Sequence, residues 1–195
     1  MTMHDYISEL IEETTDDLLK GIATSPAGNY LMNVNPNCKR LDSETAAIYH
    51  HLTAKLLYLA KRVRPDLQPT VSFLCTRVQS PDADDWKKLG RCLTYLRCTK
   101  DDPFTLASDG SSAIRWWVDA SYAVHPDMKS HTGATMSLGQ GCIYSMSSKQ
   151  KLNTRSSTEA ELVAVNDAMS KILWTKLFLE AQGYEISDNV VYQDN

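Results

Sequence analysis

The strongest helix signal in the chain follows a hydroxyl-rich stretch and covers residues after 156. Apolar residues there recur at steps of three and four, the spacing of one helix face; they are Leu162, Val165, Met169, Ile172 and Leu173. Ser156 with Glu159, and Thr158 with Glu161, each fit the capping box that opens a helix, and Gly183 fits its end. The pattern predicts a long helix that buries this face.

The remaining elements follow from the same patterns. Residues 4–20 carry apolar positions at helical spacing, whereas 21–40 are rich in glycine, proline and asparagine and predict irregular chain. Further helices are predicted over 42–62, 67–79 and 83–98. Short strands are predicted over 104–107, 114–123, 132–138, 142–147 and 189–193.

From about residue 112 the order of elements is therefore strand, strand, strand, helix, strand. The first three strands have short connections and should be antiparallel, and the helix should return the last strand parallel to the first. This is a mixed sheet of the α+β or α/β class. Asp119 and Asp194 then lie on neighbouring strands, near Glu161 at the helix start.

Three carboxylates in one pocket would repel one another. Their natural partners are hard divalent cations with oxygen ligands, Mg²⁺ or Mn²⁺, and a pair of such ions can activate water against a phosphodiester. Taken alone, Glu161 has another interpretation, a helix-start carboxylate favoured by the helix dipole.

Composition narrows the class of protein. The net charge is −4, with 43% hydrophobic and 23% charged residues, so a globular core is expected and a basic nucleic-acid arm is not. Five cysteines without a C-x-x-C pair favour free thiols. Neither a signal peptide nor a membrane span is expected, which predicts an intracellular protein with no membrane partner.

Basic residues offer candidate contacts to nucleic acid. Lys87, Lys88, Arg91 and Arg97 belong to the predicted helix 83–98, and Lys149, Lys151 and Arg155 flank the proposed acidic pocket. A solvated surface is the alternative for both groups.

Other conspicuous side chains are expected to be ordinary. The histidines at 50, 51, 125 and 131 form no metal-binding pair at helical spacing, so we expect them to be structural or exposed. Trp116, Trp117 and Trp174 are expected in the core.

Several segments carry a resemblance to a known family. These are VDAS at 118–121, SSTEAE at 156–161 after SSKQ at 147–150, and YQDN at 192–195. Together they resemble the ribonuclease H domain of copia-type retrotransposon polyproteins. The segments LLYLA at 56–60, RPD at 64–66, WKKL at 86–89 and LTYLRCTK at 93–100 resemble the connecting region before that domain.

The resemblance covers about 41–195 and implies three parts. Residues 1–40 would be the tail of the polymerase region or a linker, 41–103 a helical connection region, and 104–195 a ribonuclease H-like domain. It implies Asp119, Glu161 and Asp194 as catalytic metal ligands, with Glu159 as the capping partner of Ser156.

The implied activity is hydrolysis of the RNA strand of RNA–DNA hybrids during reverse transcription with two Mg²⁺ (or Mn²⁺) ions. Partners would be the hybrid or other nucleic acid and other parts of the polyprotein, in the cytoplasm within virus-like particles or in the nucleus.

The sequence departs from the family pattern in three places. Ser121 replaces a frequent second aspartate, the Tyr-x-Asp-Asp polymerase motif is absent, and the fourth catalytic carboxylate and later elements would lie beyond residue 195. We therefore expect a truncated domain. Two alternatives stay open, namely a non-catalytic module that binds nucleic acid or a partner, and a structural α+β domain with surface acids.

Overall fold

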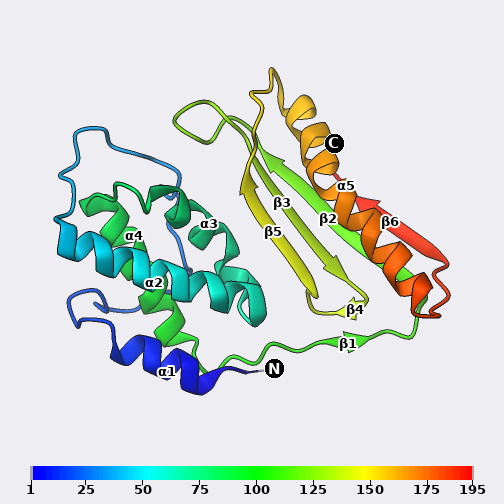
Figure 1. The fold of residues 1–195 in the computed structure, drawn as a ribbon, viewed down its shortest axis with the longest axis horizontal. Coiled ribbons are helices and arrows are strands. Elements are labelled where there is room, and N and C mark those ends of the chain that lie inside the picture. Colours follow the sequence, from blue (N-terminus) through cyan, green and yellow to red (C-terminus); the bar gives the residue numbers. More distant parts are fainter. Residues whose placement is uncertain (1, 195) are drawn as a thin grey trace. The chain divides into compact units, whose positions relative to one another are not determined.

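Residues 2–194 are described by a computed structural model (Figure 1). Its internal contacts divide the chain into two compact units, and the boundary along the chain falls between Phe104 and Thr105. The first unit is helical and the second is built on a sheet. None of the helices in residues 2–194 is long and apolar enough to cross a membrane.

The helical unit contains α1 (His4–Glu12), α2 (Ser43–Arg62), a 3-10 turn (Pro65–Leu67), α3 (Gln68–Arg77) and α4 (Ala83–Cys98). Its core is mainly leucine, contributed by all four helices. Asp42 caps α2 and Asp82 caps α4, each by accepting backbone N–H groups of the first turn.

The first helix is shorter than the predicted 4–20. The chain leaves α1 after Glu12 and continues in turns, in which Leu18 donates to the Thr15 carbonyl and Leu19 to the Asp16 carbonyl. These turns carry Leu18 and Leu19 into the core. Residues 13–39 contain no helix or strand, as predicted for most of them.

The sheet unit contains β1 (Ala107–Ser108), β2 (Ala113–Ser121), β3 (His131–Ser137), β4 (Gly139–Gln140), β5 (Tyr144–Lys149), α5 (Ser157–Ala181) and β6 (Asp188–Tyr192). The main sheet has the order β5-β3-β2-β6. The β2–β3 and β3–β5 pairs are antiparallel, and β2–β6 is parallel. The predicted α+β fold with its mixed sheet is confirmed.

The crossover helix α5 packs against β2 and β3 (Figure 1). The core between helix and sheet holds Ile114, Trp116, Val118, Ala134, Met136, Ala164, Ala168 and Ile172. The predicted alternation along β2 is confirmed, because residues 114, 116 and 118 are buried and 117 and 119 are exposed.

The buried face of α5 differs from the predicted one. It consists of Ala160, Glu161, Ala164, Ala168 and Ile172. Of the predicted face only Ile172 is buried, while Leu162, Met169 and Leu173 are exposed. The alanines let the helix lie close to the sheet, and large apolar residues on several sides of the helix hid this face from a periodicity argument.

Candidate functional site

Asp119 and Asp194 are brought together by the parallel pairing of β2 with β6. Trp117 lies opposite Tyr192 in the register of the two strands. The same offset places Asp194, two residues beyond Tyr192, level with Asp119. The two aspartates are therefore neighbours at the carboxyl ends of adjacent strands.

Glu161 reaches the same place from the first turns of α5. Ser156 caps this helix by accepting the Glu159 N–H at 3.2 Å. The Glu159 carboxylate accepts the Arg155 N–H at 2.6 Å, one residue before the Ser156 N–H that a capping box would use. Thr158 lies within the first turn rather than at the cap. Glu159 thus fixes the helix start, and Glu161 faces the strands.

Glu161 is 7% exposed, and both oxygens of its carboxylate have partners. Oε1 accepts the Ala120 N–H at 3.1 Å, and Oε2 accepts the Gln193 side-chain amide at 3.0 Å. Asp119 Oδ1 accepts the same Ala120 N–H at 2.8 Å. One backbone donor thereby holds two carboxylates beside each other.

Asp119, Glu161 and Asp194 each offer a carboxylate oxygen, and these three atoms lie within 4.8 Å of one another. The structure thus assembles the three acids that the sequence singled out. No lysine, arginine or histidine in residues 2–194 forms an ion pair with any of them, and the donors to Glu161 are neutral.

The donor set fits a hard divalent cation. Two unit charges 4.8 Å apart repel by roughly 1 kcal/mol in water and roughly 3 kcal/mol at the effective dielectric constant near a protein surface. A cation bound by all three oxygens would remove this repulsion, and oxygen-only ligands suit Mg²⁺ or Mn²⁺.

The basic residues of α4 mostly hold the chain itself. Lys88 is buried, donates to the Asn33 carbonyl and lies 4.5 Å from the centre of the Phe73 ring. Arg97 donates to the Leu19 and Gly21 carbonyls, and Arg91 donates to Ser25 Oγ at 2.9 Å.

These contacts give three of the four cations a role within the chain, and contact of α4 with phosphate stays a prediction. Lys88, Arg91 and Arg97 fasten the irregular segment after α1 onto the helix. Lys87 alone of the four keeps its ammonium exposed, at 3.3 Å from the Asp84 carboxylate.

Of the basic residues proposed beside the acidic pocket, Lys149 pairs with Asp127 at 2.7 Å and Arg155 is exposed. Their contact to nucleic acid stays a prediction.

Sequence reasoning missed two sets of polar contacts in the sheet unit. Gln193 supports Glu161, and its only sequence signal is its place next to Asp194. His125 and His131 are both buried and form a chain in which His131 lies 3.0 Å from His125 and 2.7 Å from Ser147 Oγ. The expectation that these two histidines are structural agrees with this burial.

Two tryptophans expected in the core are exposed. Trp117 is 45% exposed and stacks on Tyr192, with ring centres 5.4 Å apart, on the open face of the sheet. Trp174 is 60% exposed on α5. Only Trp116 of the three is buried.

Comparison with known proteins places the whole chain beside polyproteins of mobile elements. It is 28% identical to the retrovirus-related Pol polyprotein from transposon TNT 1-94 of Nicotiana tabacum, over all of this chain and 15% of that protein. It is 31% identical to the retrovirus-related Pol polyprotein from transposon RE2 of Arabidopsis thaliana, over all of this chain and 13% of that protein. The chain is related to retrotransposon Pol polyproteins.

A further relative is a putative transposon Ty5-1 protein of Saccharomyces cerevisiae, 26% identical over 88% of this chain and 56% of that protein. The resemblance to retrotransposon polyproteins inferred from the sequence is confirmed, although the chain spans only about 13 to 15% of the plant relatives. No family model and no solved structure matches it.

Proposed function

We propose that the sheet unit is a ribonuclease H-type nuclease, which hydrolyses the RNA strand of RNA–DNA hybrids during reverse transcription of a retroelement. The observation that carries this proposal is the meeting of Asp119, Glu161 and Asp194 within 4.8 Å. Three separate elements supply them, namely β2, α5 and the residues just after β6. Relationship to Pol polyproteins supports the same conclusion.

Asp119, Glu161 and Asp194 would hold Mg²⁺ or Mn²⁺, with two ions as the proposed number. When bound, such ions supply a nucleophile from water at neutral pH and stabilise the leaving oxygen of a phosphodiester. The task of the chain is to present the oxygens. Ala120 N–H and the Gln193 amide orient Glu161, and the strand pairing sets the two aspartates side by side.

Selectivity for RNA would come from contacts to the 2′-hydroxyl groups and from the minor-groove shape of the hybrid. A nuclease of this type should therefore leave double-stranded DNA of the same sequence intact. This outcome separates the proposed activity from general phosphodiester hydrolysis.

The test is cleavage of a labelled RNA–DNA hybrid by the full chain in Mg²⁺ or Mn²⁺, compared with Asp119→Asn. We expect Asp119→Asn to lower the rate by about 100-fold or more, because loss of outer-shell support alone costs 10- to 100-fold in metal sites. Asp188→Asn is the matched control, since Asp188 is an exposed carboxylate of β6 outside the cluster.

The nuclease activity would be refuted if the folded wild-type chain cleaved no hybrid in either ion. Equal binding of the hybrid by wild type and Asp119→Asn would then favour the non-catalytic module. Equal cleavage by wild type and Asp119→Asn would reject the assigned site.

A further inference from the structure

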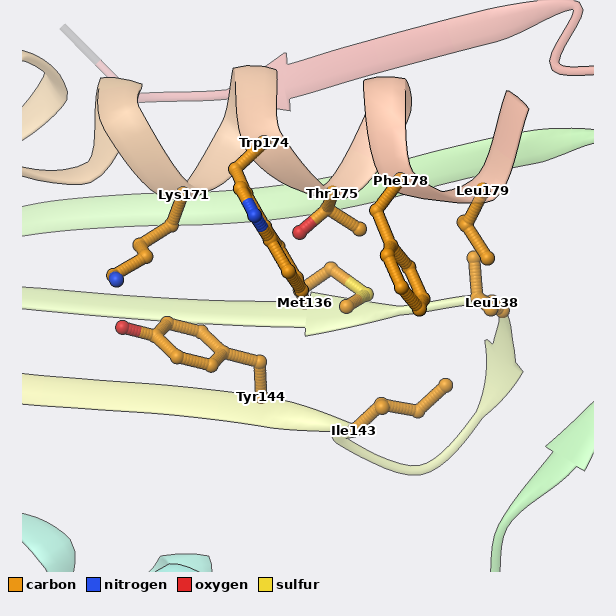
Figure 2. Close-up of a pocket in the computed structure, with 9 residues that line it drawn as sticks. All are labelled: Met136, Leu138, Ile143, Tyr144, Lys171, Trp174, Thr175, Phe178 and Leu179. Atoms are coloured by element: carbon orange, nitrogen blue, oxygen red, sulfur yellow. The ribbon is translucent and has the colours of Figure 1, made fainter. Parts of the chain in front are cut away.

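A cavity of about 410 Å³ lies in the sheet unit, between the second half of α5 and the strands β3 and β5 (Figure 2). Its apolar lining includes Met136, Leu138, Ile143, Trp174, Phe178 and Leu179. Pockets that bind small molecules fall in this range of volume and are lined mainly by apolar and aromatic side chains.

One wall of the cavity is a pair of parallel aromatic rings. Trp174 and Phe178 lie one helical turn apart on α5, with ring centres 4.9 Å apart and planes inclined by 10°. Figure 2 shows both side chains reaching from the helix toward the strands. They are 60% and 45% exposed, so this wall is open to a ligand.

Two polar groups lie at one end of the cavity, and the Thr175 hydroxyl lies between the two aromatic side chains of α5. Figure 2 shows the Lys171 ammonium and the Tyr144 hydroxyl at the end away from Leu138 and Leu179. Lys171 forms no ion pair within residues 2–194. Burial raises the pKa of Tyr144, so its hydroxyl stays a neutral hydrogen-bond donor.

The position of Lys171, the charged residue of this lining, at one end of the cavity defines the ligand. We propose that the cavity binds a small amphipathic anion, an aromatic carboxylate, whose ring packs on Trp174 and Phe178 and whose carboxylate meets Lys171. A flat bicyclic molecule fits both the volume and the ring pair.

The pocket is separate from the acidic cluster. Lys171 follows Glu161 by ten residues on α5, which is about 15 Å along the helix axis. The inference therefore does not depend on the proposed nuclease activity, and each can fail without the other.

The test is calorimetric titration of the full chain with naphthoate and with its neutral analogue naphthylmethanol. We expect naphthoate to bind about fivefold more tightly, the upper range for an exposed ion pair. Lys171→Met should abolish this preference, and Trp174→Ala should weaken both ligands. Lys176→Met is the matched control, because Lys176 lies on the same helix, faces Glu180 and does not line the cavity.

Three outcomes would overturn the proposal. The first is that neither probe binds. The second is that the preference for naphthoate survives Lys171→Met. The third is sedimentation showing a dimer that Trp174→Ala dissociates, since a second copy of the chain would then cover the cavity. Trp174 is largely exposed, so its truncation leaves the core intact.

Discussion

Replacing Asp119 by asparagine should stabilise the chain when divalent ions are chelated, and this advantage should vanish when they are added. In the chelated protein Asp119 repels both Glu161 and Asp194, whose oxygens lie within 4.8 Å. Asparagine keeps the size of the side chain and removes the charge. The prediction therefore isolates the electrostatic cost of assembling the site.

The magnitude follows from Coulomb's law. Each pair of charges at 4.8 Å costs roughly 1 kcal/mol in water and roughly 3 kcal/mol at an effective dielectric constant of about 20. Asp119 is exposed and belongs to both pairs, so solvent keeps its repulsion with Asp194 and with Glu161 near the lower figure. Asp119→Asn should thus raise the free energy of unfolding by about 2 kcal/mol in chelator.

Added metal should remove this difference in the free energy of unfolding between Asp119→Asn and wild type. An ion at 100 times its dissociation constant stabilises the protein that binds it by about 2.7 kcal/mol. A variant that binds about 100-fold more weakly gains only a few tenths of a kcal/mol at the same concentration. The advantage of Asp119→Asn should therefore fall to about zero.

The assay is urea unfolding followed by tryptophan fluorescence, in chelator and in Mn²⁺. Trp116, Trp117 and Trp174 belong to the sheet unit, so they report mainly on the unit that holds the site. Asp188→Asn should show no such dependence on metal. A destabilising effect of Asp119→Asn in chelator, or a difference from wild type that metal leaves unchanged, would refute the reasoning.

Three further predictions concern other polar contacts of the chain. Arg77→Met should lower the free energy of unfolding by about 3 kcal/mol in urea titrations, because it leaves the carboxylates of Asp82 and Asp85 buried without their ion pair. Burial lowers the pKa of His131 to about 4, so as the pH falls the unfolded chain protonates this imidazole before the folded chain does. The contribution of neutral His131 to the free energy of unfolding is therefore complete above about pH 6.5 and should fall by roughly 3 kcal/mol between pH 6.5 and 4. His131→Gln should flatten this dependence on pH. Gln193→Leu should weaken Mn²⁺ binding in calorimetry about tenfold, because it removes a donor that orients the helix-borne carboxylate.

Each of these predictions has an internal control. Lys87→Met removes an exposed ion pair of α4, the helix that carries Asp85, and should change stability by less than about 1 kcal/mol. His50→Gln, which removes an exposed histidine of the helical unit, is the matched histidine control. Gln140→Leu, at an exposed glutamine of β4, should leave Mn²⁺ binding unchanged; equal effects at either glutamine would contradict the role assigned to Gln193.

The topology of the sheet unit could be predicted because local signals agree with one another. Alternation along β2 separated its buried and exposed residues, and short connections fixed the antiparallel pairs. A helix between the last two strands leaves a parallel return as the simplest arrangement. These rules suffice to place Asp119, Glu161 and Asp194 together from the sequence alone.

The roles of the α4 cations could not be predicted in this way. Sequence spacing shows that Lys88, Arg91 and Arg97 belong to one helix, but it does not show what covers that helix. The covering segment has no regular structure, and its free carbonyls need donors. Lys88 and Arg97 supply them, through contacts between residues more than 50 positions apart.

The buried face of α5 was also predicted wrongly, because sequence spacing does not show how closely the helix approaches the sheet. This difference bears directly on the site. Periodicity ranks faces by the size of their apolar residues, whereas a helix that crosses a sheet closely needs small ones. Ala160, Ala164 and Ala168 provide that close face, and Glu161 next to the first of them is thereby carried to the Ala120 N–H. With leucines on this face the helix would stand further from β2. The alanines that misled the prediction of the core are thus the residues that let a helix-borne carboxylate join two strand aspartates.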